Sequence, residues 1–138
     1  MADVSEQGFT RDGVAVCPDA EKGAELTGSD MARWLGMSQA DKRKELTSKP
    51  LPEITVTQEM RQEAFDNWET TDDHGMVIYG IAKDQNGKEY FMVKNSWGTE
   101  GKYKGIWYAS KAFAAYKTMN ILVNKHAIPA DIAKKLGL

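Results

Sequence analysis

The sequence predicts an α+β domain in which an antiparallel β-sheet or half-barrel carries helices at its periphery. Apolar residues recur at helical spacing over residues 57–68. Beyond residue 75 they instead form short runs separated by turn residues, and an Asn-Gly pair at 86–87 lies between two of these runs. Strands joined by tight turns, beside separate helices, are typical of this fold class.

Residues 1–56 form the first of two predicted segments. They are rich in Gly, Ser, Asp and Pro, and their apolar residues occur only in short groups. We therefore expect an irregular segment with short helices, and a buried extended stretch at 14–16, where the sequence is Val-Ala-Val. Pro50 and Pro52 end this segment, because proline lacks the N–H that a continuing helix or strand would use.

Residues 57–138 form the second segment, which is predicted to be the β lobe. Thr57 is suited to cap a helix over 57–68, because its hydroxyl can accept a hydrogen bond from the first helical turn. Strands at 76–81 and 90–93 flank the turn at 84–87, and together they predict a β-hairpin.

The remainder of this segment is expected to extend the sheet. Residues 105–109 predict a third strand, Ser110 caps a short helix after it, and residues 119–123 predict a further strand. Pro129 is placed to begin a last helix and Gly137 to end it.

Composition excludes several classes of function. The 138 residues carry a formal net charge of -2, and the lysines are scattered among acidic residues. Such a surface lacks the clustered positive charge that nucleic acid or an anionic membrane would require, so neither partner is expected. No apolar run approaches the ~20 residues that span a bilayer. Cys17 is the single cysteine, so we expect no internal disulfide, which is compatible with a reducing compartment and the expected cytoplasmic location. With only His74 and His126 beside it there is no metal-ligand spacing, so no metal site is expected. No cofactor is expected either.

His74 and Asn95 are the candidate catalytic residues. His74 lies where the predicted helix gives way to the first strand, and Asn95 follows the second strand of the same hairpin. Antiparallel pairing would bring the two side chains to one end of the sheet. In a Cys-His peptidase the imidazole takes the thiol proton, and an amide oxygen that accepts from the far ring nitrogen fixes its tautomer. Trp97 is placed to cover that hydrogen bond and exclude water.

The sequence around these residues resembles the papain superfamily of cysteine peptidases. Asp-His-Gly-Met at 73–76, followed by Val-Lys-Asn-Ser-Trp-Gly at 93–98, is similar to the His and Asn motifs of that superfamily in the same order. The longer match, which continues through 110 into the tail, resembles the bleomycin hydrolase and aminopeptidase C branch. Residues 2–5, Ala-Asp-Val-Ser, are similar to a segment between nucleophile and histidine in that branch.

This resemblance implies a role for each matching residue. His74 corresponds to the general base and thiolate partner, Asn95 to the amide that orients it, and Trp97 to the shielding indole. Asp73 stands where papain relatives often have a polar or acidic residue, and it either tunes the ion pair or is a solvated turn carboxylate.

The resemblance also implies a role for the C-terminal arm, residues 135–138. In the bleomycin hydrolase branch the chain's terminal carboxylate reaches the active-site cleft and engages the free amine of the substrate, which makes the enzyme an aminopeptidase. Leu138 would carry that carboxylate here. A frayed terminal turn is the other interpretation of the arm.

The nucleophile is the largest departure from the family pattern. Papain-like enzymes place it in a Cys-Trp context at the start of a long buried helix, behind an oxyanion-hole glutamine, and no such motif is present. Cys17 lies only 57 positions before His74 (74 − 17), and Pro18 removes an N–H that a helix terminus would direct at the oxyanion. We therefore expect Cys17 to be structural.

These observations predict the C-terminal portion of a papain-like cysteine aminopeptidase, which hydrolyses peptide bonds. The chain alone is expected to be inactive, because the nucleophile would reside on a missing N-terminal lobe. A peptide substrate and that lobe are the expected partners, and the resemblance implies a hexameric parent. We expect this chain to form a homo-oligomer by self-association through an exposed apolar face. The alternatives are a non-catalytic binding module on the same scaffold and a small thiol enzyme that uses Cys17.

Overall fold

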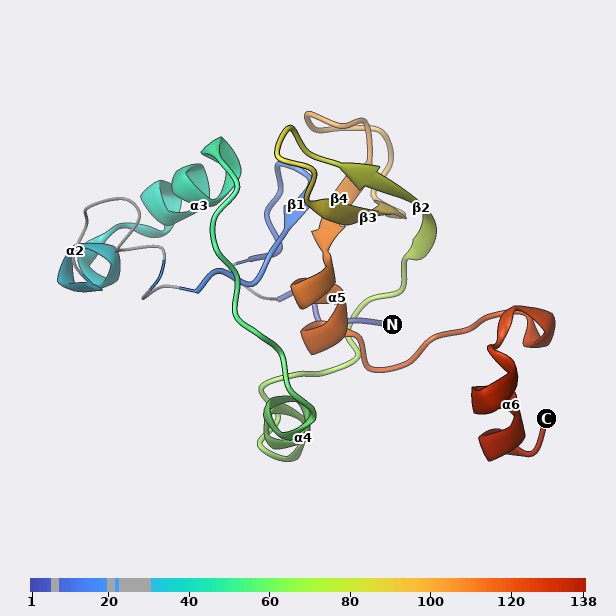
Figure 1. Ribbon diagram of the computed structural model, residues 1–138. Helices are drawn as coiled ribbons and strands as arrows, with labels where there is room; N and C mark the ends of the chain where they lie inside the picture. Colours follow the sequence, from blue (N-terminus) through green and yellow to red (C-terminus); the bar gives the residue numbers. More distant parts are fainter. Residues whose placement is uncertain (6–7, 20–21, 23–30) are drawn as a thin grey trace.

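The computed structural model describes residues 1–5, 8–19, 22 and 31–138, and it shows a four-stranded sheet with helices beside it (Figure 1). The strand order is β1-β4-β3-β2, where β2 pairs antiparallel with β3, β3 antiparallel with β4, and β4 parallel with β1. The strands are β1 (Val14–Ala15), β2 (Val77–Lys83), β3 (Glu89–Lys94) and β4 (Ile106–Ser110). The predicted α+β class is confirmed, and the sheet is antiparallel except for the parallel pair of β1 and β4.

The hairpin of β2 and β3 forms where the sequence predicts it. Val77 lies opposite Lys94 at one end and Lys83 opposite Glu89 at the other. Gly87 takes the left-handed conformation with φ 80°, which glycine adopts without steric cost. Asp84 stabilises the turn because its carboxylate accepts from the N–H groups of Asn86 (2.8 Å) and Lys88 (3.0 Å).

The helices begin at the predicted caps. The hydroxyl of Thr57 accepts from the N–H of Met60, and that of Ser110 accepts from the N–H of Phe113. Helix α4 ends earlier than predicted, because Trp68 adopts a left-handed conformation with φ 65°. The described helices are α2 (Met31–Gly36), α3 (Gln39–Ser48), α4 (Gln58–Asp66), α5 (Lys111–Lys117), the 3-10 helix η1 (Lys125–Ala127) and α6 (Ala130–Leu136).

The core packs one face of the sheet against α5 and draws on both predicted segments. Its buried members are Ala15, Cys17, Val93, Trp107, Ala109 and Phe113. Phe9 stacks on the indole of Trp107 at 5.5 Å, and that indole donates to the carbonyl of Thr10 at 2.8 Å. Residues before position 20 therefore complete the packing of the β lobe.

The predicted strand at 119–123 is wrong. Thr118 forms an isolated bridge with Ala2, and Met1 bonds to the N–H of Met119 and to the carbonyl of Asn120. From residue 121 the chain has no strand partner and runs away from the sheet to η1 (Figure 1). The local sequence has the apolar and β-branched character of a strand, but strand formation also needs a neighbour to accept its hydrogen bonds. Among the described residues no strand pairs with residues 121–123. The helices of the described ranges also include none long and apolar enough to cross a membrane.

Candidate active site

The backbone places His74 and Asn95 at one end of the hairpin. His74 precedes β2 and pairs with Ala2 in an isolated antiparallel bridge, with N···O distances of 2.9 and 3.1 Å. Asn95 follows β3, and its N–H donates to the carbonyl of Gly105 at 3.2 Å. Val77 lies opposite Lys94 in the last pair of the hairpin. His74 and Asn95 lie just beyond this pair, so they meet at the same end of the hairpin.

The two side chains form a direct hydrogen bond. His74 Nε2 lies 2.8 Å from Asn95 Oδ1. The same oxygen accepts from the N–H of Ser96 at 2.7 Å, which identifies it as the amide oxygen rather than the nitrogen. An amide oxygen only accepts, so Nε2 carries the hydrogen. In the neutral imidazole Nδ1 then holds the lone pair and is the atom that can take a proton.

Asn95 is buried, at 2% exposure, and its amide nitrogen is not satisfied. Within the part of the chain that the structure describes, Asn95 Nδ2 has no hydrogen-bond acceptor. A buried donor without an acceptor costs about 1–3 kcal/mol. Among the described contacts, the amide of Asn95 therefore acts through its oxygen.

Trp97 lies against the imidazole as the sequence predicts. The ring centroids of His74 and Trp97 are 4.9 Å apart with an angle of 41° between the planes. The indole meets Phe9 and Trp107 edge to face, at 6.0 and 5.6 Å. Trp97 is 51% exposed, so about half of the residue stays open to solvent while the indole contacts these three rings.

Asp73 contacts the N-terminal segment. Its two carboxylate oxygens accept from the N–H of Val4 at 3.0 Å and from the hydroxyl of Ser5 at 2.8 Å. These contacts support neither a role of Asp73 in tuning the ion pair nor a solvated turn carboxylate. They make Asp73 an anchor that ties the loop before His74 to residues 4–5.

Asp3 is a supporting residue that sequence reasoning missed. Its carboxylate is buried, at 3% exposure, and accepts from the N–H of Thr71 at 2.9 Å and from both the N–H and the hydroxyl of Ser5. Burial raises the pKa of the Asp3 carboxyl, but these hydrogen bonds and the nearby Lys117 ammonium outweigh burial, so its pKa lies below the usual value. The sequence of residues 2–5 is similar to the family, but this similarity alone does not predict a role for Asp3.

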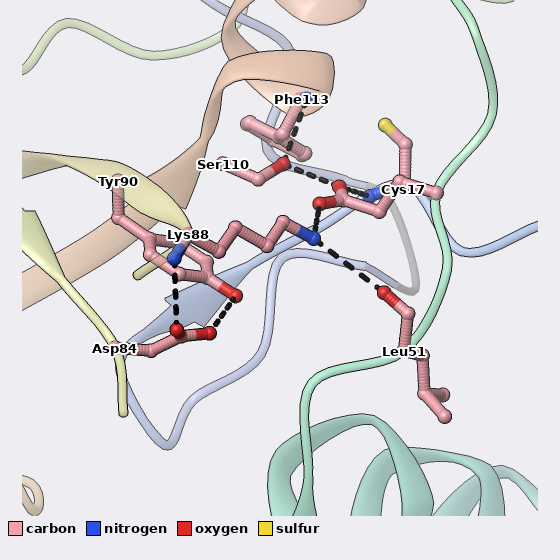
Figure 2. A network of polar contacts seen from close by, with 8 residues as sticks. Cys17, Leu51, Asp84, Lys88, Tyr90, Ser110 and Phe113 are labelled. Atoms are coloured by element: carbon pink, nitrogen blue, oxygen red, sulfur yellow. Dashed lines mark hydrogen bonds and ion pairs between the residues drawn. The ribbon is translucent and has the colours of Figure 1, made fainter. Parts of the chain in front are cut away.

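Cys17 lies in the core cluster instead of at an open surface. Its N–H donates to the carboxylate of Glu53 at 2.8 Å, and its carbonyl accepts from Ile54 at 3.1 Å. Figure 2 shows Cys17 beside this buried carboxylate, which also accepts from the hydroxyl of Ser110 and pairs with the ammonium of Lys88. The thiol side chain, 9% exposed, packs among apolar groups. This environment favours a structural role.

Leu138 ends the chain on the exposed α6. Its N–H donates to the carbonyl of Ala133 at 3.0 Å, and the side chain is 71% exposed. Gly137 adopts the left-handed conformation that closes the helix, as predicted. No cluster of His, Cys, Asp and Glu that could hold a metal ion occurs among the described residues.

Comparison with known proteins places this geometry in context. The model of the family described as peptidase C1-like matches residues 28–137. Cathepsin L1 of Drosophila melanogaster is 48% identical over 34 residues, which cover 25% of this chain and 9% of that protein. Cathepsin L of Sarcophaga peregrina is 52% identical over 27 residues, which cover 20% of this chain and 8% of that protein.

A solved structure shares the fold over nearly the whole chain. The crystal structure of pepw from Lactobacillus rhamnosis superposes with a TM-score of 0.54 at 24% identity, covering 97% of this chain and 25% of that one. The chain therefore spans less than a tenth of the curated relatives that it matches and a quarter of the solved relative.

Proposed function

Because the chain belongs to the peptidase C1-like family of cysteine peptidases, we propose that it is the His- and Asn-bearing C-terminal portion of a papain-like cysteine aminopeptidase. The bleomycin hydrolase and aminopeptidase C branch is the proposed parent, and peptides are the proposed substrates. One observation carries the proposal: His74 Nε2 and Asn95 Oδ1 lie 2.8 Å apart, in the tautomer that leaves Nδ1 able to accept a proton.

The proposed reaction begins at Nδ1 of His74. The imidazole takes the proton of a cysteine thiol supplied by a preceding lobe, and the resulting thiolate adds to the carbonyl carbon of the substrate. His74 then gives its proton to the leaving amine as the C–N bond breaks, and an acyl-enzyme forms on the cysteine sulfur. Water hydrolyses this thioester with His74 as base, which restores the thiol and releases the carboxylic acid.

Asn95 and Trp97 support the imidazole in this proposal. The neutral amide of Asn95 holds the ring by accepting from Nε2–H, and it orients the base without adding a negative charge beside it. The indole of Trp97 excludes water from one side of this bond, which strengthens the bond by lowering the local dielectric. Asp73 and Asp3 support the imidazole indirectly, because they hold the loop that carries His74 against residues 2–5.

The chain alone is proposed to be inactive. An oriented imidazole without a nucleophile and an oxyanion hole offers no route to the acyl intermediate. Cys17 is buried in the core, where a substrate carbonyl would have to displace packed side chains to reach it. Peptide hydrolysis is therefore proposed to require the missing lobe as a partner.

The proposal is tested by joining this chain to a nucleophile-bearing lobe. A fusion with the N-terminal lobe of a family member, which carries the Cys-Trp motif and the glutamine, should hydrolyse a fluorogenic aminoacyl amide. His74→Ala should lower the rate about 10³-fold or more. His126→Ala is the matched control, because His126 is an exposed histidine on η1 and its loss should leave the rate unchanged. Activity that survives His74→Ala would refute the assigned role.

The terminal carboxylate of Leu138 is proposed to pair with the amine of the substrate. The exposure of Leu138, just beyond α6, supports this proposal, because the carboxylate is available to a cleft formed with another lobe. The fusion should then cleave a substrate with a free amine and spare the N-acetylated form. Two glycines added after Leu138 should abolish this discrimination, and equal cleavage of both substrates by the unextended chain would contradict the assignment.

A further inference from the structure

The edge strand β2 presents apolar side chains on both of its faces. Val77, Ile78, Tyr79 and Ile81 are all more than half exposed. A register shift between Ile78 and Gly80 leaves Tyr79 unpaired in a bulge, so Ile78 and Ile81 lie on one face of the strand and Val77 on the other. Successive side chains of a strand point to opposite faces, so neither face of β2 is covered. A strand that is apolar on both faces is typical of the interior of a sheet. Yet β2 ends the strand order, and among the described residues no strand pairs with its outer edge.

A second unpartnered element lies in the tail, defined here as residues 120–138. Ile121, Leu122 and Val123 are exposed, and the side chain of Leu122 is 100% exposed. These residues run extended without a strand partner, as noted above. The α6 helix that follows has seven residues, none of them buried. Helices this short are not stable in water without packing partners. The tail therefore requires a surface that its own body does not provide.

The tail cannot reach the β2 edge of its own chain directly. Ala2 forms bridges with both His74 and Thr118, so it stands between the start of β2 and the start of the tail. The N-terminal amine of Met1 also donates to the carbonyl of Asn120 at 2.9 Å. Two strand spacings, about 9–10 Å, thus separate Thr118 from His74, which precedes β2. Pairing within one chain would require residues 1–2 to be displaced.

We propose that residues 121–123 of one copy add as a strand to the β2 edge of a second copy, and that the exchange is reciprocal. One chain carries both an unpaired apolar edge and an unpaired apolar segment, so a two-fold axis satisfies both at once. The backbone groups of the edge then gain hydrogen-bond partners, and Leu122 leaves water. The exchange leaves His74 and Asn95 in place, but it carries the C-terminal arm of each chain, Leu138 included, onto the other copy.

Charge complementarity supports a second copy as the occupant and gives the direction of pairing. In the proposed antiparallel addition Val123 pairs with Val77, so the tail leaves the edge at the end of β2 that follows residues 59–73 in the sequence. This stretch is acidic, with one arginine against Glu59, Glu63, Asp66, Glu69, Asp72 and Asp73. The tail is basic, with Lys125, Lys134 and Lys135 against Asp131 and the terminal carboxylate. Opposite charges favour this approach.

Sedimentation velocity of the full chain over a range of concentrations tests the exchange. The wild-type chain should form a dimer. Leu122→Asp removes the tail contact and Ile81→Lys the edge contact, and each should weaken the dimer at least about tenfold, a free-energy difference of about 1.4 kcal/mol or more. Leu35→Asp is the matched control: Leu35 is also exposed, at 68%, but lies on α2 and should leave the dimer intact. Circular dichroism checks that all variants are folded, which is expected because the replaced side chains are exposed.

A mixing experiment separates this exchange from other dimers. A Leu122→Asp chain keeps its edge and an Ile81→Lys chain keeps its tail, so an equimolar mixture should form a heterodimer through one intact contact. Its dissociation constant should lie between that of the wild type and those of the single variants. A wild-type chain that is monomeric at every concentration, a dimer that survives either substitution, or a mixture that stays monomeric would each overturn the proposal.

Discussion

His74 and Asn95 lie 21 positions apart in the chain, yet His74 Nε2 and Asn95 Oδ1 are separated by only 2.8 Å. The β2–β3 hairpin produces this contact, because antiparallel pairing returns the chain to the end at which it started. The hydrogen bond assigns the proton to Nε2, and this tautomer can be measured in the chain without any catalytic partner.

Asn95→Ala should abolish the preference of His74 for the Nε2–H tautomer. The amide oxygen is the acceptor that stabilises this form, and without it both neutral tautomers become accessible. Long-range ¹H–¹⁵N correlation spectra of the imidazole distinguish the two forms directly. The signals of His126 provide an internal control, because that ring lies on η1 and should not respond. An unchanged His74 tautomer in the variant would contradict the assigned acceptor.

Trp97→Ala should destabilise the fold by about 1–3 kcal/mol, because the indole makes edge-to-face contacts with Phe9 and Trp107 that are each worth about 0.5–1.5 kcal/mol. Urea denaturation measures the free energy of unfolding. Trp68→Ala is the matched control: its indole is 82% exposed, and its removal should change the free energy by less than about 0.5 kcal/mol. Equal effects of the two substitutions would refute the packing role of Trp97.

Asp3 should make stability depend on pH in the acid range. The pKa of its carboxyl in the folded chain is lower than the ordinary value of 3.8, so the folded state favours the carboxylate. Its contribution is therefore fully present above the unfolded pKa and is lost as pH falls through the lower folded pKa. Asp3→Asn should lower the free energy of unfolding at pH 7, and the gap to the wild type should shrink below pH ~4. Asp12→Asn, at an exposed position, should show no such gap at any pH.

Glu53→Gln should destabilise the fold by about 1–3 kcal/mol. The substitution replaces the carboxylate that accepts from several buried donors with a neutral amide that accepts from them less well. The native carboxylate accepts from Cys17 and Ser110 and pairs with Lys88, and only 7% of its side chain is exposed (Figure 2). Thermal denaturation provides the readout. The control is Glu89→Gln: that carboxylate pairs with Lys83 and Lys111 at the surface, where solvent screening makes the loss small. If both variants melt alike, the buried network does not contribute as argued.

Cys17 should react slowly with an alkylating reagent in the folded chain and rapidly in denaturant. Its thiol is packed in the core, so modification requires the fold to open. His74→Ala should not alter the rate beyond its effect on stability, which mass spectrometry of the alkylated chain can follow. Rapid alkylation of the native chain that is lost on His74→Ala would instead support the small thiol enzyme as the function.

Local features of this protein could be predicted from its sequence because their causes are local. The Asn-Gly turn, the hydroxyl caps at Thr57 and Ser110, and the glycine that closes α6 each depend on a few consecutive residues. The meeting of His74 and Asn95 is nearly as local, because one hairpin register determines it.

Only the tertiary structure decided which distant segments complete the site and which strands find partners. Residues 2–5 hold the loop before His74 through Ala2, Asp3 and Ser5, although about seventy positions separate them in the chain. Residues 119–123 have the composition of a strand, but residues 121–123 lack a neighbouring strand, which no local pattern reveals. The physical reason is that hydrogen-bond partners and burial are properties of pairs of segments, whereas propensity and capping are properties of one.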